Sequence, residues 1–216
     1  MASTTLGTIS RGPGLRCAVL FAIGCAVVGS VVSGAEPDGP VSNRVTHFSL
    51  PDVAGKKHTL GQWQDQQAVV LFFIGTECPV SNGYSPDMQA IAAKYAARGV
   101  ICFGIHADPS VSAADAAAHA KDYALPFPIL LDREQRLAEM TGARVTPDAI
   151  VVSPDGTVRY RGRIDDRYAS DGKRRDDPTT HELVDALEAV LAGKVPAIAQ
   201  TKAFGCPLPI LRSKGH

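Results

Sequence analysis

A continuous apolar run, Ala68–Ile74, restricts the folds open to this chain. The run is rich in β-branched and aromatic side chains and contains no polar residue, which is typical of a strand buried on both faces. A second such run, Val100–Ile105, comes after a segment whose apolar residues recur at helical spacing up to Gly99. Together they predict a strand–helix–strand unit in an α/β sheet covered by helices.

The rest of the chain repeats this alternation and then ends it with a hairpin. Helices are expected over 113–123, 135–140 and 181–191, and a further strand over 127–131. A Pro-Asp-Gly turn separates the strand-like runs Ala149–Val152 and Val158–Gly162 and predicts that they pair as a hairpin. We therefore expect a mixed central β-sheet flanked by helices.

The first 35 residues differ in character from the rest of the chain. Arg11 and Arg16 precede a stretch from Cys17 to Ala35 that carries no charge and ends in small side chains. This order is that of a secretory signal peptide, and an uncleaved membrane anchor is the alternative. We expect four parts: a signal peptide or anchor over 1–35, a Pro/Gly-rich linker over 36–43, a folded domain over 44–193 and a tail over 194–216. The protein would then be exported to the periplasm or cell envelope, with membrane association if the segment is retained.

The charge balance argues against nucleic acid as a partner. The chain has 22 Lys+Arg and 22 Asp+Glu. Without residues 1–35, which hold two arginines and no acid, 20 basic residues face 22 acidic ones, a net charge of −2. Nucleic-acid binding depends on basic side chains that neutralise phosphates, so we expect no such partner. The charged stretch around Asp165–Arg167 is expected to be a solvated loop.

Three of the five cysteines lie beyond the N-terminal segment. Cys102 sits in the middle of an apolar strand and is expected to fill the core. Cys78 comes directly after the first buried strand and before a helix, and sites in open α/β sheets form at such strand ends. A thiol at a helix N-terminus ionises readily, because the free amides and the helix dipole favour an anion. Cys78 is therefore the candidate nucleophile.

The phrase from Phe72 to Ser81 resembles the site of thioredoxin-like thiol-disulfide oxidoreductases, in particular the exported TlpA/ResA-like and AhpC/TSA-type redoxins. In that family a strand ends in a phrase like FWATWCPPC, and Thr76, Cys78 and Pro79 stand at the corresponding positions. Pro86 also stands eight residues after the cysteine, as in thioredoxins. The similarity runs from about Val45 to Leu191, and it implies a thioredoxin-like fold and thiol-disulfide exchange without a cofactor.

The resemblance also implies roles for residues far from Cys78 in the sequence. The family places a cis-proline opposite the nucleophile, just before the hairpin, where this chain has Thr146 and Pro147. Thr146 would then offer an unpaired backbone edge to an extended substrate, so these residues, with Pro79, are the expected substrate-binding set. The partner would be a protein thiol or disulfide, or a redoxin that donates electrons.

The chain departs from the family at the second cysteine of CxxC, which is Ser81 here. A hydroxyl cannot resolve a mixed disulfide, so either Cys78 acts alone, another cysteine serves, or redox function is lost. Cys206, in a Gly-Cys-Pro stretch of the tail, is the candidate resolver, and an incidental thiol or an intermolecular bridge is the alternative. We take Cys78, Cys206, Thr76 and Ser81 as the candidate catalytic set. Glu77 replaces the family's tryptophan and is expected to oppose thiolate formation.

Two other functions stay open. Peroxiredoxins place a proline seven residues and a Thr or Ser three residues before the attacking cysteine, where this chain has Leu71 and Gly75. Thr76 is one place out of register for that role. A copper-binding or redox-inactive module would pair Cys78 with His106, but the histidines lack the spacing of metal ligands. We expect no metal site.

Overall fold

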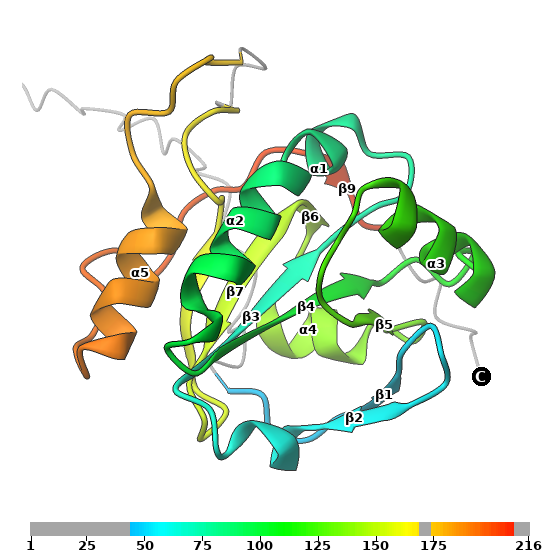
Figure 1. The fold of residues 1–216 in the computed structure, drawn as a ribbon, viewed down its shortest axis with the longest axis horizontal. Coiled ribbons are helices and arrows are strands. Elements are labelled where there is room, and N and C mark those ends of the chain that lie inside the picture. The colour runs from blue at the N-terminus through cyan, green and yellow to red at the C-terminus, as the bar shows by residue number, and fades with distance from the viewer. Residues whose placement is uncertain (1–43, 169–173, 210–216) are drawn as a thin grey trace, which may run out of the picture. The chain divides into compact units, whose positions relative to one another are not determined.

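The computed structural model describes residues 44–168 and 174–209, and the fold is that of these residues (Figure 1). The expected segments over 1–35 and 36–43, and residues 210–216 of the tail, lie outside them. A central sheet of five strands has the order β5–β4–β3–β7–β8. Its strands are β3 Ala68–Phe73, β4 Val100–His106, β5 Ile129–Leu131, β7 Asp148–Val152 and β8 Val158–Gly162. Strands β3, β4 and β5 are parallel, whereas β7 and β8 form the antiparallel hairpin, so the expected mixed sheet is confirmed.

The remaining elements surround this sheet or lie at its ends. The helices are α1 Pro79–Gly83, α2 Ser85–Ala96, α3 Ala113–Asp122, α4 Arg136–Thr141, α5 Glu182–Leu191 and the 3-10 helix η1 Leu60–Trp63. Two small antiparallel pairs complete the set: β1 Ser49–Pro51 with β2 Lys57–Thr59, and β6 Val145–Thr146 with β9 Cys206–Pro207.

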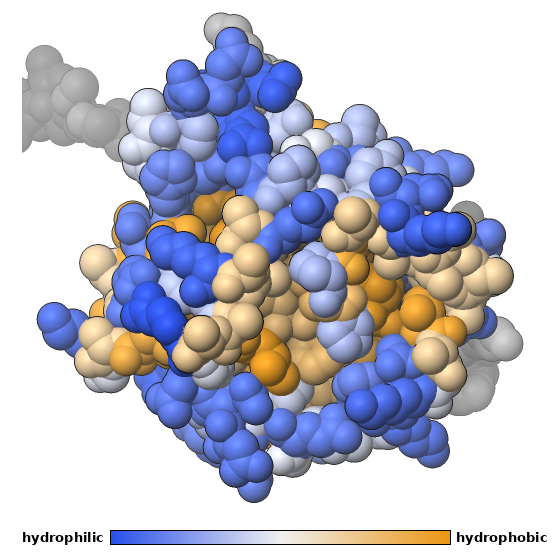
Figure 2. All heavy atoms as spheres, viewed as in Figure 1, coloured by the Kyte–Doolittle hydropathy of each residue, from blue (hydrophilic) through white to orange (hydrophobic). Residues whose placement is uncertain are grey.

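Strand β3 shows why the continuous apolar run is needed. Successive side chains of a strand point to opposite faces, and here both faces are covered. Val70 and Phe72 pack in one core with α2 and α5, whereas Leu71 and Phe73 pack in the other with α4 and η1. Figure 1 shows α2, α3 and α5 on the near face of the sheet and α4 behind it. In the same view, apolar surface gathers between α2 and α3 within a hydrophilic surround (Figure 2).

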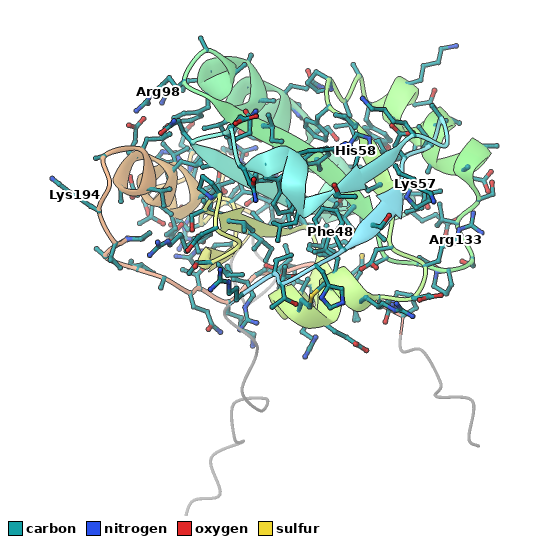
Figure 3. All side chains as sticks on the ribbon, turned by 90° about the horizontal axis from the view of Figure 1, so that it is seen from below. Phe48, Lys57, His58, Arg98, Arg133 and Lys194 are labelled. Atoms are coloured by element: carbon teal, nitrogen blue, oxygen red, sulfur yellow. The ribbon has the colours of Figure 1, made fainter. Side chains whose placement is uncertain are left out.

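The β1–β2 hairpin closes the α4 side of the sheet. Phe48, labelled beside the hairpin in Figure 3, packs against Trp63 with ring centroids 4.8 Å apart. His58 in β2 lies 5.4 Å from the ring of Phe103, and its Nε2 lies 2.9 Å from a carboxylate oxygen of Asp52. The hairpin is therefore held by ring packing underneath and by the hydrogen bond between His58 and Asp52 at its turn.

The expectation of a solvated loop around Asp165 is wrong. Asp165 is 3% exposed and accepts a hydrogen bond of 2.5 Å from the hydroxyl of Tyr84. Arg167 forms two hydrogen bonds with Asp87, of 2.6 and 2.9 Å. Buried polar groups are stable when their hydrogen-bonding partners are present, as they are here. The loop therefore fastens the start of α2 rather than extending into solvent.

In the parts of the chain that the structure covers, 44–168 and 174–209, no helix is both long and apolar enough to cross a membrane.

Candidate active site

Cys78 stands where β3 gives way to α1, at the N-cap position of the helix. Its Sγ accepts a hydrogen bond of 3.4 Å from the amide of Ser81, one of the amides that the first helical turn leaves free. Pro79 occupies the first helical position, where its missing N–H has no cost. The thiol is 3% exposed, so the expected strand-end, helix-start position is confirmed and is nearly closed to solvent.

The loop before β7 lies directly against this thiol. The bond between Thr146 and Pro147 is cis, and Sγ of Cys78 donates a hydrogen bond of 2.9 Å to the carbonyl oxygen of Thr146. Gly75 makes this approach feasible, since a Cβ there would lie 3.0 Å from Oγ1 of Thr146 and 3.2 Å from Cβ of Cys78. The site therefore favours a residue without a side chain directly before the Thr-Glu-Cys phrase.

The tail brings a second cysteine to the same place. In the β6–β9 pair, Thr146 stands opposite Cys206, and the amide of Leu208 donates a bond of 2.8 Å to the carbonyl of Arg144. Gly205 is fitted closely to this edge, because a Cβ there would lie only 1.9 Å from the carbonyl oxygen of Thr146. The edge that we expected to be unpaired is therefore occupied by the chain's own tail.

The tail reaches this edge by running alongside β8. The amide of Arg161 donates to the carbonyl of Ala199 (3.0 Å), and the amide of Thr201 donates back to Arg161 (2.9 Å). Beyond the paired strands, Nε2 of Gln135 donates to the carbonyl of Pro209 at 2.7 Å. Contacts before and after Cys206 thus hold its position.

The three described cysteines are free thiols with different acidities. Burial raises the pKa of Cys78, but hydrogen bonds from the Cys206 thiol, the Thr146 hydroxyl and the Ser81 amide outweigh the effect of burial, so the pKa of Cys78 lies below the ordinary value. Burial, together with the neighbouring Cys78, raises the pKa of Cys206 to about 11. Burial alone raises the pKa of Cys102 to about 12, as suits a core thiol. Cys78 is therefore the thiol that most readily forms a nucleophilic thiolate.

A cavity of about 720 Å³ adjoins the two thiols. Cys78, Thr76, Thr146 and Cys206 line one part of it. Residues from the end of β4 and from α3 line another, among them His106 and His119. The opening lies at the carboxyl end of the parallel strands, where open α/β sheets form their sites.

The two histidines of the cavity are buried neighbours. Their ring centroids are 5.4 Å apart, and Nε2 of His119 donates a hydrogen bond of 2.9 Å to the side-chain oxygen Oδ1 of Asn82. Burial lowers the pKa of His106 to about 4 and also lowers that of His119, so both are neutral near pH 7. Within residues 44–168 and 174–209, no cluster of three or more His, Cys, Asp or Glu side chains has the arrangement of a metal site.

The other candidate residues surround Cys78 in different ways. Oγ of the buried Ser81 accepts a bond of 3.4 Å from the amide of Gly75. The carbonyl of Thr76 accepts a bond of 3.0 Å from Asn82, whereas Pro79 is exposed. Glu77 is also exposed, where water screens its charge, and the pKa of Cys78 is lowered despite its presence.

Sequence reasoning did not find His119 as a cavity residue, or Asn82 as its hydrogen-bond partner. The order Cys-Pro-Val-Ser-Asn did place an amide one turn after Cys78, but His119 lies on a helix whose register against α1 the sequence does not reveal. The sequence shows Gly205 only as a residue that flanks Cys206, and does not reveal its close approach to the carbonyl of Thr146.

The strand order, the cis-proline and a cysteine at the start of a helix define a thioredoxin-like redoxin. A structure of a thiol:disulfide interchange protein, DsbE, from Chlorobium tepidum has the same fold, with a TM-score of 0.56, 20% identity, and coverage of 70% of this chain and 98% of that one. More specifically, the chain belongs to the AhpC/TSA family, whose model matches residues 41–161.

Relatives with higher identity include both curated proteins and solved structures. The thiol-disulfide oxidoreductase ResA of Bacillus anthracis is 27% identical over 118 residues, which make up 55% of this chain and 66% of the relative. The match thus spans just under two thirds of that protein. A hypothetical protein from Sinorhizobium meliloti 1021 is 30% identical, with a TM-score of 0.69 and coverage of 78% and 93%. An uncharacterized conserved protein from Geobacillus kaustophilus is 26% identical, with a TM-score of 0.70 and coverage of 81% and 94%.

Proposed function

We propose that this protein is a thiol-disulfide oxidoreductase in which Cys78 is the nucleophile and Cys206 the resolving thiol. The observation that carries the proposal is the pairing of Thr146 with Cys206 in β6 and β9, which brings a second thiol to the cavity that Cys78 lines and to the residue that Cys78 contacts. The similarity to ResA, named as a thiol-disulfide oxidoreductase, supports it. Cys206 thereby replaces the second cysteine of CxxC, which is Ser81 in this chain.

The chemistry is set by the acidities of the two thiols. The thiolate of Cys78 attacks one sulfur of a disulfide, forms a mixed disulfide and expels the other sulfur as a thiolate. Cys206 then attacks the sulfur of Cys78, forms a Cys78–Cys206 disulfide and releases the second product thiol. Two electrons pass from the protein to the substrate, and the two protein thiols supply the two protons. The amide of Ser81 stabilises negative charge on Cys78 whenever it is the thiolate.

Capture of the intermediate tests this proposal. The reduced protein is mixed with hydroxyethyl disulfide, quenched with alkylating agent and digested for mass mapping. We expect a Cys78–Cys206 disulfide in the wild type, a stable Cys78 mixed disulfide in Cys206→Ser, and no reaction in Cys78→Ser. Cys102→Ser is the control and should behave as wild type. Equal reaction of Cys78→Ser and wild type would refute the oxidoreductase proposal.

The rate at which hydrogen peroxide oxidises Cys78, compared with the rate of disulfide exchange, distinguishes this proposal from a peroxidase. Leu71 and Gly75 replace the proline and hydroxyl residue that peroxiredoxins use to hold a peroxide, so we expect slow sulfenic acid formation at Cys78 relative to disulfide exchange. Peroxide oxidation that outpaces disulfide exchange would instead assign a peroxidase.

We infer further that the site works in an exported protein. A signal peptide or anchor over 1–35, a linker over 36–43, a redoxin domain over 44–193 and a tail over 194–216 suit a compartment where disulfides persist. Pro79, Thr146 and Pro147 would contact the substrate, and a dithiol redoxin would return electrons. N-terminal sequencing of the protein recovered from the periplasm tests the cleavage, with residue 36 expected first.

A further inference from the structure

The seated tail closes one route to Cys78. An extended protein segment could reach the thiol by pairing with the Arg144–Thr146 edge, but the backbone of Cys206–Leu208 already fills that edge. The carbonyl of Arg144 accepts the amide of Leu208, and Oγ1 of Thr146 donates to the carbonyl of Cys206 at 3.4 Å. A partner strand must therefore displace the tail, and with it the resolving thiol.

The other route stays open while the tail is seated. The cavity of about 720 Å³ is lined by both Cys78 and Cys206, so a molecule inside it meets the nucleophile and the resolving thiol together. Cavities of several hundred Å³ are of the size that encloses a small molecule. His106 lines the same cavity and is 1% exposed, and its Nε2 has no hydrogen-bond partner among the described residues. The cavity thus combines the thiols of Cys78 and Cys206 with the neutral imidazole ring of His106.

The Asp, Glu, Lys and Arg residues that line this cavity are all of the acidic kind. Four acidic residues line the cavity, and among its described lining residues there is no lysine or arginine: the acids are Glu77, Asp108, Asp115 and Asp122. Asp108 and Asp115 each accept a hydrogen bond of 2.6 Å from a hydroxyl group, that of Ser110 and of Ser112 respectively. The two histidines add no positive charge near pH 7, because burial lowers the pKa of each. Clefts lined by one sign of charge concentrate ligands of the opposite sign.

We propose that the oxidising substrate is a small disulfide with cationic arms, which enters this cavity while the tail stays seated. The inference rests on the proposed function and adds its substrate class. In the balanced reaction, R–S–S–R and the two thiols of Cys78 and Cys206 give two R–SH and one Cys78–Cys206 disulfide. The sulfur–sulfur bond of the substrate breaks, that of the protein forms, and a dithiol reductant restores the protein.

A series of disulfides of similar size and different charge tests the proposal. The fully reduced, full-length protein reacts in single turnovers with cystamine (cationic), hydroxyethyl disulfide (uncharged) or dithiodiglycolate (anionic). Each rate constant is divided by that of the same disulfide with free 2-mercaptoethanol, which removes differences in intrinsic reactivity. We expect the normalised rate for cystamine to exceed that for dithiodiglycolate by about tenfold or more in dilute buffer. The ratio should fall toward one in about 1 M NaCl, where charges are screened within a few ångströms.

Charge-neutralising variants identify the residues responsible. Asp108→Asn with Asp122→Asn should lower the cystamine-to-dithiodiglycolate ratio by roughly threefold or more, because two cavity charges are lost. Asp185→Asn, a charge change at an exposed position on α5 away from the lining, should leave the ratio as in wild type. Using a ratio within each variant cancels any general loss of activity.

The outcomes separate this inference from the proposed function. A wild-type ratio at or below one, or a ratio that the double variant does not change, would overturn the cationic substrate class. In either case the reaction with hydroxyethyl disulfide, if it depends on Cys78, leaves the oxidoreductase proposal standing. Absence of any Cys78-dependent reaction with the uncharged disulfide would overturn the proposed function itself, and the inference with it.

Discussion

At the scale of single residues, the two thiols of the site differ mainly in their surroundings. Cys78 has the Ser81 amide and the Cys206 thiol to stabilise its negative charge. Cys206 has no comparable donor among its described contacts, and its charge would face that of Cys78. In the proposed mechanism this difference sets the order of attack, with Cys78 first and Cys206 second.

The pH dependence of the Cys78 thiolate tests this account. Titration monitored by the ultraviolet absorbance of the thiolate should show a midpoint below the ordinary value for cysteine, since hydrogen bonds lower the pKa of Cys78. Cys206, with a pKa of about 11, and Cys102, with a pKa of about 12, would not contribute near neutrality. In Cys206→Ala the midpoint should move upward, because the largest hydrogen bond favouring the thiolate is lost. An unchanged midpoint would mean that the Cys206 thiol does not contact Cys78.

Asp148 gives a second prediction at this scale. It is 4% exposed, and burial raises its pKa to about 7. A folded-state pKa above the unfolded value favours folding at low pH, and this contribution is lost as the pH rises through the folded value. Asp148→Asn should therefore change stability little near pH 4 and stabilise the protein above pH 7, by on the order of a few kcal/mol. Urea unfolding at several pH values measures this, and a stabilisation confined to acid pH would contradict it.

At the scale of elements, the local signals of the sequence were sufficient for the strands and helices but not for the tail. Strands β3, β4, β5 and β7 are encoded by apolar runs, β8 by the Pro-Asp-Gly turn before it, and the longer helices such as α2 and α5 by the spacing of their apolar residues. Residues 194–209 have neither pattern, so nothing local indicates that they run beside β8 and end as β9. The buried Asp165 escaped prediction for a related reason, since its partner Tyr84 is 81 residues away.

The substitution Gly205→Ala, which adds one methyl group, tests whether the tail pairs with the Thr146 edge. Gly205→Ala would place a Cβ 1.9 Å from the carbonyl of Thr146, so we expect β9 to leave the edge. Alkylation of Cys206 should then accelerate, and so should the reaction of Cys78 with a protein disulfide such as that of insulin. Gly61→Ala is the matched control, because its Cβ would meet nothing nearer than 3.9 Å. Equal Cys206 alkylation in both variants and wild type would show that the tail is not held as described.

At the scale of the whole molecule, the two thiols close most of the domain into one loop. The chain leaves the sheet after β3 at Cys78, builds every later strand and helix, and returns to the same point at Cys206. The folded chain holds both residues beside Thr146, so a disulfide between them would join two positions that the fold already brings together. Its main effect would fall on the unfolded chain, whose freedom it restricts.

Oxidation should therefore stabilise the protein as well as store two oxidising equivalents. Disulfides typically stabilise a fold by about 2–4 kcal/mol, and the chain-entropy relation gives about 5 kcal/mol for a loop as long as the one between Cys78 and Cys206. We expect the oxidised wild type to unfold at higher urea concentration than the reduced form, with both forms of Cys206→Ser alike. The same stabilisation lowers the reduction potential of the pair, because free energy that favours the disulfide opposes its reduction. Equal stability of the oxidised and the reduced wild type would contradict this prediction. It would mean that the tail, with Cys206, does not unfold in the same transition as the rest of the domain.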